Sequence, residues 1–147
     1  MKTKIIIATL ILFITIGIVA ATDINNLNMP DGWESLNDGT YHEIGDSAGG
    51  GSGQNMIIQK WADSLKDEYY QNITDEEYTV MDTGNNTFMY IDDLNENAGS
   101  FEVVEIDGEK YFVNFWTVDY TDTEEITDTS FFLVKFNELN DLEPIAV

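Results

Sequence analysis

One acidic stretch comes nearest to a metal site by residue type and spacing. Between residues 92 and 99, oxygen-bearing side chains stand at alternate positions, as they do in a calcium-binding loop. Such a loop also needs glycine at its sixth position and glutamate at its twelfth, where this chain has Ala98 and Val104. The sequence therefore favours a solvated acidic turn and keeps a weak calcium site as the alternative. The ligands of that site would be Asp93, Asn95, Asn97 and Glu105.

Side chains that commonly carry catalysis are scarce. The chain has no Cys, which removes thiolate chemistry and Cys-based metal sites, and its single histidine, His42, has no partner motif around it. The glycine-rich residues 46–55 lack the Gly-Lys-Ser/Thr ending of a phosphate loop. A carboxylate pair for glycan hydrolysis stays open as an idea, although nothing selects two of the 28 acidic residues. We therefore predict no catalytic residue and expect His42 to be a surface or cross-strand side chain.

Charge separates the classes of partner that remain. The chain has 28 Asp and Glu against six Lys and no Arg, a formal net charge of −22 at pH 7. Nucleic-acid binding is excluded, because its affinity comes mainly from Lys and Arg that displace counterions. The same field disfavours anionic membrane surfaces. Cations, basic proteins and neutral glycans remain as ligand classes.

The first 21 residues have the pattern of a signal peptide. Two lysines precede the mostly apolar run of residues 5–19, and small residues suited to cleavage follow. We predict an exported protein, secreted or associated with the cell envelope, whose single acidic domain spans residues 22–147; an uncleaved anchor is the alternative. In an exported chain the two Asn-x-Thr sequons are candidate glycosylation sites, at Asn72 and Asn85.

A helix is predicted after the glycine-rich stretch. Ile57, Trp61, Leu65 and Tyr69 recur every four residues, which is the spacing of an apolar stripe on an amphipathic helix over residues 55–70. Packing against a sheet is the expected role of this stripe.

Strand patterns and a closing helix follow. The dipeptide Asp107-Gly108 is the strongest hairpin signal, because both positions of a type I′ turn need positive φ. Asp128 can cap a helix that runs to about residue 140, with a strand over residues 130–136 as the alternative. The predicted strands are residues 39–44, 78–81, 87–91, 101–106 and 109–118.

The last predicted strand is apolar on both faces, since Val113 and Phe115 alternate with Phe112 and Trp116. A strand of this kind is covered on both sides. We therefore predict an α+β fold, an antiparallel sheet of about five strands with helices packed on its faces.

Three short motifs carry a family resemblance: Met29-Pro30-Asp31-Gly32-Trp33, the hairpin residues 107–111, and Leu142-Glu143-Pro144-Ile145. With them the chain resembles small exported proteins of unknown function from methanogenic archaea, and its order of elements is similar to that of the PsbP/Mog1 family. That resemblance implies an α/β/α sandwich and no particular ligand.

The function expected from the sequence is a non-catalytic binding or interaction module of the cell envelope or extracellular space. Its partner would be an envelope protein or a neutral glycan. A weak calcium-dependent module and a carboxylate-pair glycan hydrolase are the alternatives.

Overall fold

The computed structural model describes residues 23–43, 54–66, 78–92, 97–117 and 123–147. Several sequence predictions fall outside these ranges: the signal peptide, the sequon residue Asn72, and the hypothetical calcium ligands Asp93 and Asn95.

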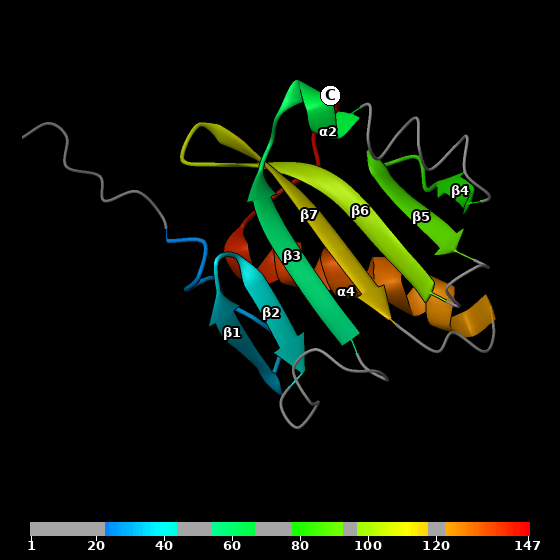
Figure 1. The fold of residues 1–147 in the computed structure, drawn as a ribbon, viewed down its shortest axis with the longest axis horizontal. Helices are drawn as coiled ribbons and strands as arrows, with labels where there is room; N and C mark the ends of the chain where they lie inside the picture. The colour runs from blue at the N-terminus through cyan, green and yellow to red at the C-terminus, as the bar shows by residue number, and fades with distance from the viewer. Residues whose placement is uncertain (1–22, 44–53, 67–77, 93–96, 118–122) are drawn as a thin grey trace, which may run out of the picture.

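One antiparallel sheet dominates the described residues (Figure 1). Its seven strands lie in the spatial order β1-β2-β3-β7-β6-β5-β4. The long hairpin β6–β7 forms the centre, and every hydrogen-bonded pair is antiparallel. The strands are β1 (Trp33–Asn37), β2 (Thr40–Glu43), β3 (Gln54–Lys60), β4 (Tyr78–Asp82), β5 (Thr87–Asp92), β6 (Asn97–Ile106) and β7 (Glu109–Thr117).

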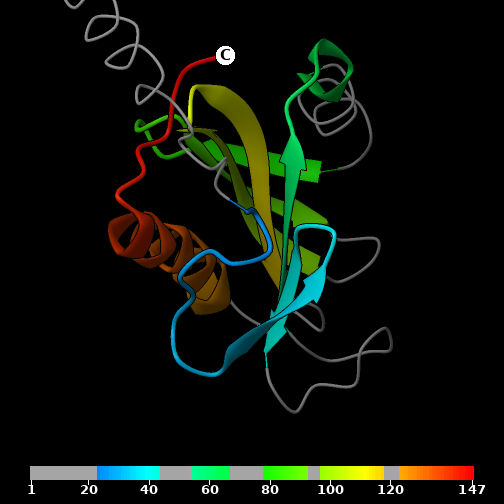
Figure 2. The same ribbon diagram turned by 90° about the vertical axis from the view of Figure 1, so that its left-hand side faces the viewer.

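Two helices are described, and they differ greatly in length. The four-residue α2 (Asp63–Lys66) follows β3, whereas α4 (Thr123–Asn140) has 18 residues. In the edge-on view of Figure 2, α4 lies on one side of the sheet and α2 on the other, and α4 contacts β5, β6 and β7. No described helix is long and apolar enough to cross a membrane.

The predicted fold class is therefore wrong. The structure is mainly an antiparallel sheet of seven strands, not about five strands sandwiched between helices. Two strands, β1 and β3, were not predicted. The helix predicted over residues 55–70 is strand β3 as far as Lys60, and within the described residues it is helical only over Asp63–Lys66.

The correction at β3 has a clear physical reason. Met56 and Ile58 are fully buried towards α4. The residues that alternate with them, Asn55, Ile57 and Gln59, point towards the other face of the sheet. This is a period of two, which a sheet can bury and a helix cannot. The four-residue spacing to Trp61 and Leu65 arose because β3 ends and the chain turns into α2.

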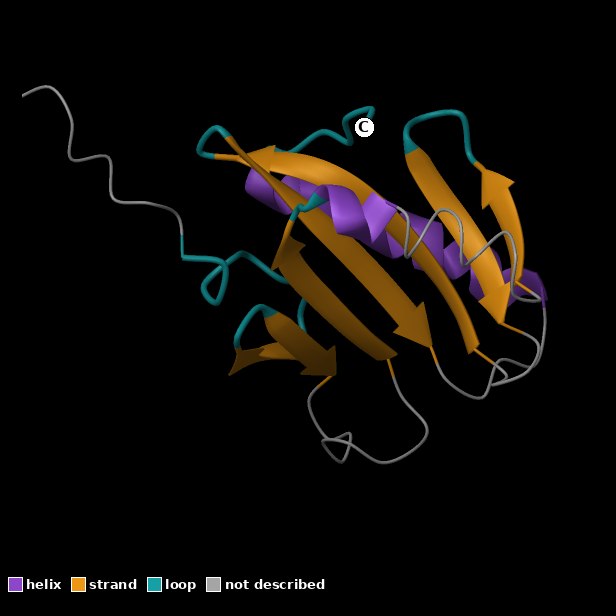
Figure 3. Ribbon diagram, turned by 45° about the horizontal axis from the view of Figure 1, so that its top comes forward, coloured by secondary structure: helices purple, strands orange, loops and turns teal. Residues whose placement is uncertain are grey.

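Two other predicted elements are confirmed. Asp107 and Gly108 have φ of 52° and 79° and connect β6 to β7, as a type I′ turn requires. The C-terminal helix is present and begins at Thr123, five residues before the predicted cap at Asp128. Its position behind the strands is visible in Figure 3.

Apolar side chains fill both faces of the sheet. The face towards α4 holds the larger cluster, which includes Phe115, Leu133 and Phe136. The opposite face holds Phe101, Val103 and Phe112, against which Trp61, Leu65, Ile145 and Val147 pack. The prediction that β7 is covered on both sides is thus confirmed.

The C-terminal residues 141–147 connect the two faces. Beyond Glu102 strand β6 has lost its neighbour β5, and the C-terminal residues take that place: Pro144 bridges to Val104, and the Ile145 N–H donates to the Val103 carbonyl at 2.8 Å. The chain leaves α4 on one face and places Ile145 on the other.

Candidate functional site

A carboxyl group buried between the sheet and α4 is the most unusual polar feature of the described residues. Glu102 is 1% exposed. Its Oε1 accepts a hydrogen bond from Asn137 Nδ2 at 2.6 Å, and its Oε2 accepts one from Thr87 Oγ1 at 2.9 Å. Buried carboxyls are rare unless both oxygens are paired, and here two neutral side chains do the pairing without a cation.

The secondary structure explains how these three side chains meet. Alternation along β6 points Ser100, Glu102 and Val104 towards α4. Thr87 stands directly opposite Glu102 in the register of β5 against β6. On α4, Asn137 lies eight residues after Thr129, so both side chains share the face turned to the sheet.

A second buried hydrogen bond lies next to Glu102 on β6. The hydroxyl groups of Ser100 and Thr129 are 2.6 Å apart. Leu133 and Phe136 of α4 are fully buried between the positions of Thr129 and Asn137. Over residues 129–137 the inner surface of α4 is therefore polar at Thr129 and Asn137 and apolar between them.

Burial sets the acidity of Glu102. Removal from water disfavours the charged form and raises the pKa of the Glu102 carboxyl above its usual value, while the hydrogen bonds from Asn137 and Thr87 oppose the rise. Desolvation is the largest of these effects. The Glu102 carboxyl is therefore a weaker acid than an ordinary glutamate in water.

A groove of about 770 Å³ opens over this buried carboxyl. Its walls are the β4–β5 turn, the outer and C-terminal part of α4, and residues 141–144. Glu102 and Asn137 line it, together with the exposed Phe131 and Val134. A volume of this size lies within the range of small-molecule sites, about 300–1,000 Å³.

All the charged side chains that line the groove, among the described residues, are acidic. Four of its lining residues are acidic, namely Glu102, Glu138, Asp141 and Glu143, and no Lys is among the described residues that line it.

The side-chain oxygen of Asn137 is a buried acceptor without a hydrogen bond. Asn137 is 6% exposed, and its Oδ1 has no hydrogen-bond partner among the described residues. A buried acceptor left without a donor costs about 1–3 kcal/mol.

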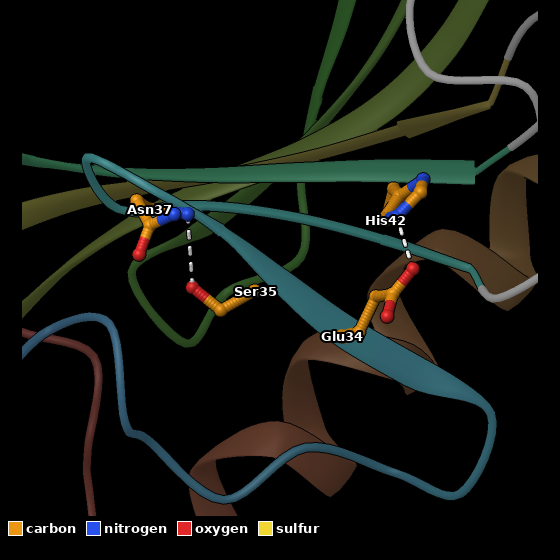
Figure 4. Close-up of polar contacts among 4 residues, drawn as sticks. All are labelled: Glu34, Ser35, Asn37 and His42. Carbon is orange, nitrogen blue, oxygen red and sulfur yellow. Dashed lines mark hydrogen bonds and ion pairs between the residues drawn. The ribbon is translucent and has the colours of Figure 1, made fainter.

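His42 belongs to a separate polar contact on the opposite face of the sheet (Figure 4). Its Nε2 lies 2.9 Å from Oε1 of Glu34, its register partner on β1. The ring is buried, and Nδ1 has no partner among the described residues. His42 was predicted to be a surface or cross-strand side chain, and it is a cross-strand residue that is buried, not a surface one.

The structure does not bring together the two described members of the hypothetical calcium site. Asn97 and Glu105 both lie on the continuous strand β6, eight residues apart. At about 3.4 Å per residue they are about 27 Å apart, too far for one ion. No group of three or more potential ligands occurs among the described residues. The calcium hypothesis otherwise depends on Asp93 and Asn95, outside the described ranges, and stays a prediction.

The sequon residue Asn85 is exposed in the β4–β5 turn, at the wall of the groove. The third residue of its sequon, Thr87, is buried and donates its hydroxyl hydrogen to Glu102. Glycosylation at Asn85 and Asn72 stays a prediction.

Sequence reasoning did not single out Glu102, Thr87 or Asn137. One signal was available: Glu102 stands between Phe101 and Val103 in the predicted strand 101–106, the hairpin neighbour of the strand that we expected to be covered on both faces. An acidic residue at such a position must be buried with partners, whichever face it occupies. The partners come from other elements and could not be named from the sequence.

A scan against protein-family models finds no match for this chain, and a search of curated proteins finds none either.

Proposed function

We propose that this protein is an exported, non-catalytic binding module that takes a ligand without negative charge in the groove over Glu102. One observation carries the proposal: a groove of about 770 Å³ has four acidic residues in its lining and no described Lys. An anion entering it meets repulsion in a partly buried setting where water screens poorly. Neutral and cationic ligands meet carbonyl, amide and carboxylate acceptors instead.

The burial and hydrogen bonding of Glu102 support a role in ligand binding and not in catalysis. Both carboxyl oxygens already accept hydrogen bonds from neighbouring side chains, and the residue is 1% exposed. A general acid or base must reach the reacting group within hydrogen-bond distance. Glu102 instead fixes the side chains of Asn137 and Thr87, which line the groove.

The apolar side chains at the rim support a ligand with a mixed surface. Phe131 and Val134 are 64% and 52% exposed on the outer side of α4, and both line the groove. An exposed aromatic ring next to hydrogen-bonding groups suits a ligand that has an apolar part and a polar part. Export is proposed from the signal-peptide pattern of residues 1–21.

Nuclear magnetic resonance titration tests the proposal. The side-chain amide of Asn137 and the backbone amides of residues 83–87 serve as reporters of the groove. Three probes differ in charge: capped lysine (Nα-acetyl-lysine amide), the neutral sugar diacetylchitobiose, and capped glutamate. We expect saturable shifts with the cationic or the neutral probe and none with capped glutamate. Equal shifts with capped glutamate, or no shifts with any probe, would overturn the proposal.

A further inference from the structure

We propose that the groove over Glu102 binds an alkylammonium group, whose N–H groups donate to Asn137 Oδ1 and to the acidic rim. This inference rests on the proposed function and chooses the cationic ligand over the neutral one. The ammonium group is the terminal group of a Lys side chain and of free alkylamines.

The unsatisfied oxygen of Asn137 is the first reason. Asn137 is more than nine-tenths buried and lines the groove, and its Oδ1 lacks a donor among the described residues. A ligand N–H would supply that donor and end the unpaired burial of this acceptor. The atom is closed to water in this structure, so the ligand reaches it only when side chains lining the groove change rotamer.

Glu102 makes that oxygen a better acceptor for a cation. Asn137 Nδ2 donates to Glu102 Oε1, and the carboxyl also accepts from Thr87. Hydrogen bonds in such a chain polarise one another, so charge on Glu102 increases the negative charge on Asn137 Oδ1. Glu102 is thus a positioning residue that acts through Asn137.

The acidic rim supplies the remaining charge. Glu138, Asp141 and Glu143 are exposed and line the same groove. An ammonium group has three donors and no acceptor, which matches a site that offers mainly acceptors. A hydroxyl of a neutral sugar could also donate to Asn137, but it would leave the charge of four acidic residues uncompensated.

Two variants on the same strand separate a specific site from the general field of an acidic protein. Glu102→Gln keeps the shape of the side chain and removes the buried charge. Glu105→Gln removes the same single charge from an exposed position on the other face of β6. At about 0.15 M ionic strength the Debye length is about 8 Å, so the distant charges of the surface are screened.

Binding of capped lysine is measured by resonance shifts of the groove amides in both variants and in the unchanged protein. We expect Glu102→Gln to weaken binding about tenfold, equivalent to about 1.4 kcal/mol, and Glu105→Gln to leave it unchanged. Capped norleucine, which lacks the ammonium group, should not bind. Equal affinity of both variants for capped lysine would overturn the inference, because the attraction would then be diffuse.

The same titrations distinguish failure of this inference from failure of the proposed function. Groove shifts with diacetylchitobiose but not with capped lysine would overturn the alkylammonium ligand and leave the binding module standing. No groove shifts with any probe would overturn both. If capped lysine binds more tightly than n-butylammonium, the ammonium group belongs to a polypeptide; equal affinities indicate a free amine. Either result supports the proposed chemistry.

Discussion

The hydroxyl of Tyr90 on β5 donates a 3.1 Å hydrogen bond to Oδ1 of Asn114 on β7, across the strand that separates them. Gly99 of β6 is the register partner of Tyr90 and makes this crossing possible. A Cβ atom at position 99 would stand 2.5 Å from the Cζ and hydroxyl oxygen of Tyr90 and 2.7 Å from the Phe115 carbonyl oxygen. The missing side chain thus lets an aromatic ring lie over the sheet.

Gly99→Ala should destabilise the protein by about 2–3 kcal/mol, because overpacking forces the backbone or the Tyr90 ring to move. Chemical denaturation measures the change. Gly84→Ala is a comparison at a glycine with nothing within 4 Å of the added Cβ, where the cost comes from its φ of +87° alone. A Gly99→Ala protein as stable as the original would show that β6 can shift freely beneath Tyr90.

Titration of Glu102 should make the stability of the folded protein depend on pH. Its pKa is raised in the folded state, so between the unfolded and folded pKa values the folded protein binds more protons than the unfolded chain. Stability therefore falls as the pH rises from the ordinary glutamate range through the folded pKa, and the loss remains above it. The other charged groups of the groove, Glu138, Asp141 and Glu143, are exposed and acidic.

Glu102→Gln should remove this fall. An amide can accept from Asn137 and donate to Thr87, so the hydrogen bonds can persist without the buried charge. We expect the melting temperature at neutral pH to rise by about 2–5 °C, the shift that about 1 kcal/mol produces in a domain of this size. Thermal unfolding of both proteins across the acid-to-neutral range measures the effect, and parallel curves would contradict it.

Two adjacent phenylalanines of α4 should respond differently to removal. The Phe132 ring stacks on Phe115 with centroids 4.1 Å apart and lies 4.7 Å from Trp33. Phe132→Ala should cost about 2–3 kcal/mol, less than a fully buried ring because Phe132 is half-buried. Phe131→Ala should change stability by about 0.5 kcal/mol or less, since that ring is 64% exposed. Denaturant titration of the two variants provides an internal comparison within one helix turn.

Tyr41 should anchor the segment that precedes β1. Its buried hydroxyl donates to the Ile24 carbonyl and accepts from the Leu27 N–H at 3.1 Å. Tyr41→Phe keeps the ring and removes both bonds, so we expect a loss of about 1–2 kcal/mol. Hydrogen exchange at the Leu27 amide should accelerate more than exchange at β6. Uniform acceleration would mean that residues 23–29 and the sheet open together.

Local signals predicted the part of the fold that depends on neighbours in sequence. The Asp107-Gly108 turn requires positive φ at both residues, and few other dipeptides accept it. The strands β5, β6 and β7 had β-branched and aromatic residues in sufficient number to be recognised. The closing helix was predicted from a cap at Asp128, although the helix begins five residues earlier, at Thr123.

The errors came where two periodicities overlap or where a turn lies between elements. Residues 57, 61 and 65 imitate a helix only because a strand, a turn and one helical turn follow each other. At β1 the turn is built from Asn37, Asp38 and Gly39 with φ of 74°, 54° and 76°, and a bulge shifts the register. Polar composition hid this edge strand, whose burial is only partial.

The candidate site depends on contacts between residues that are far apart in the sequence, so the sequence alone does not show them. Glu102, Thr87 and Asn137 come from three elements, and only the pairing of β5 with β6 and the placement of α4 bring them together. An acidic residue inside an apolar strand was the one visible sign. The calcium hypothesis instead assumed that residues 93–105 form a loop, whereas residues 97–106 are strand.

Residues 141–147 pass from one face of the sheet to the other and so connect two apolar clusters that are otherwise separate. We expect the two clusters to unfold together for this reason. Pro144 and Ile145 pair with the central strand, while Leu142 packs in one cluster and Val147 in the other. Detaching α4 from the sheet therefore pulls on side chains that cover the opposite face. The two halves of the interior should lose their protection in a single kinetic event, so that unfolding has one rate constant for both clusters.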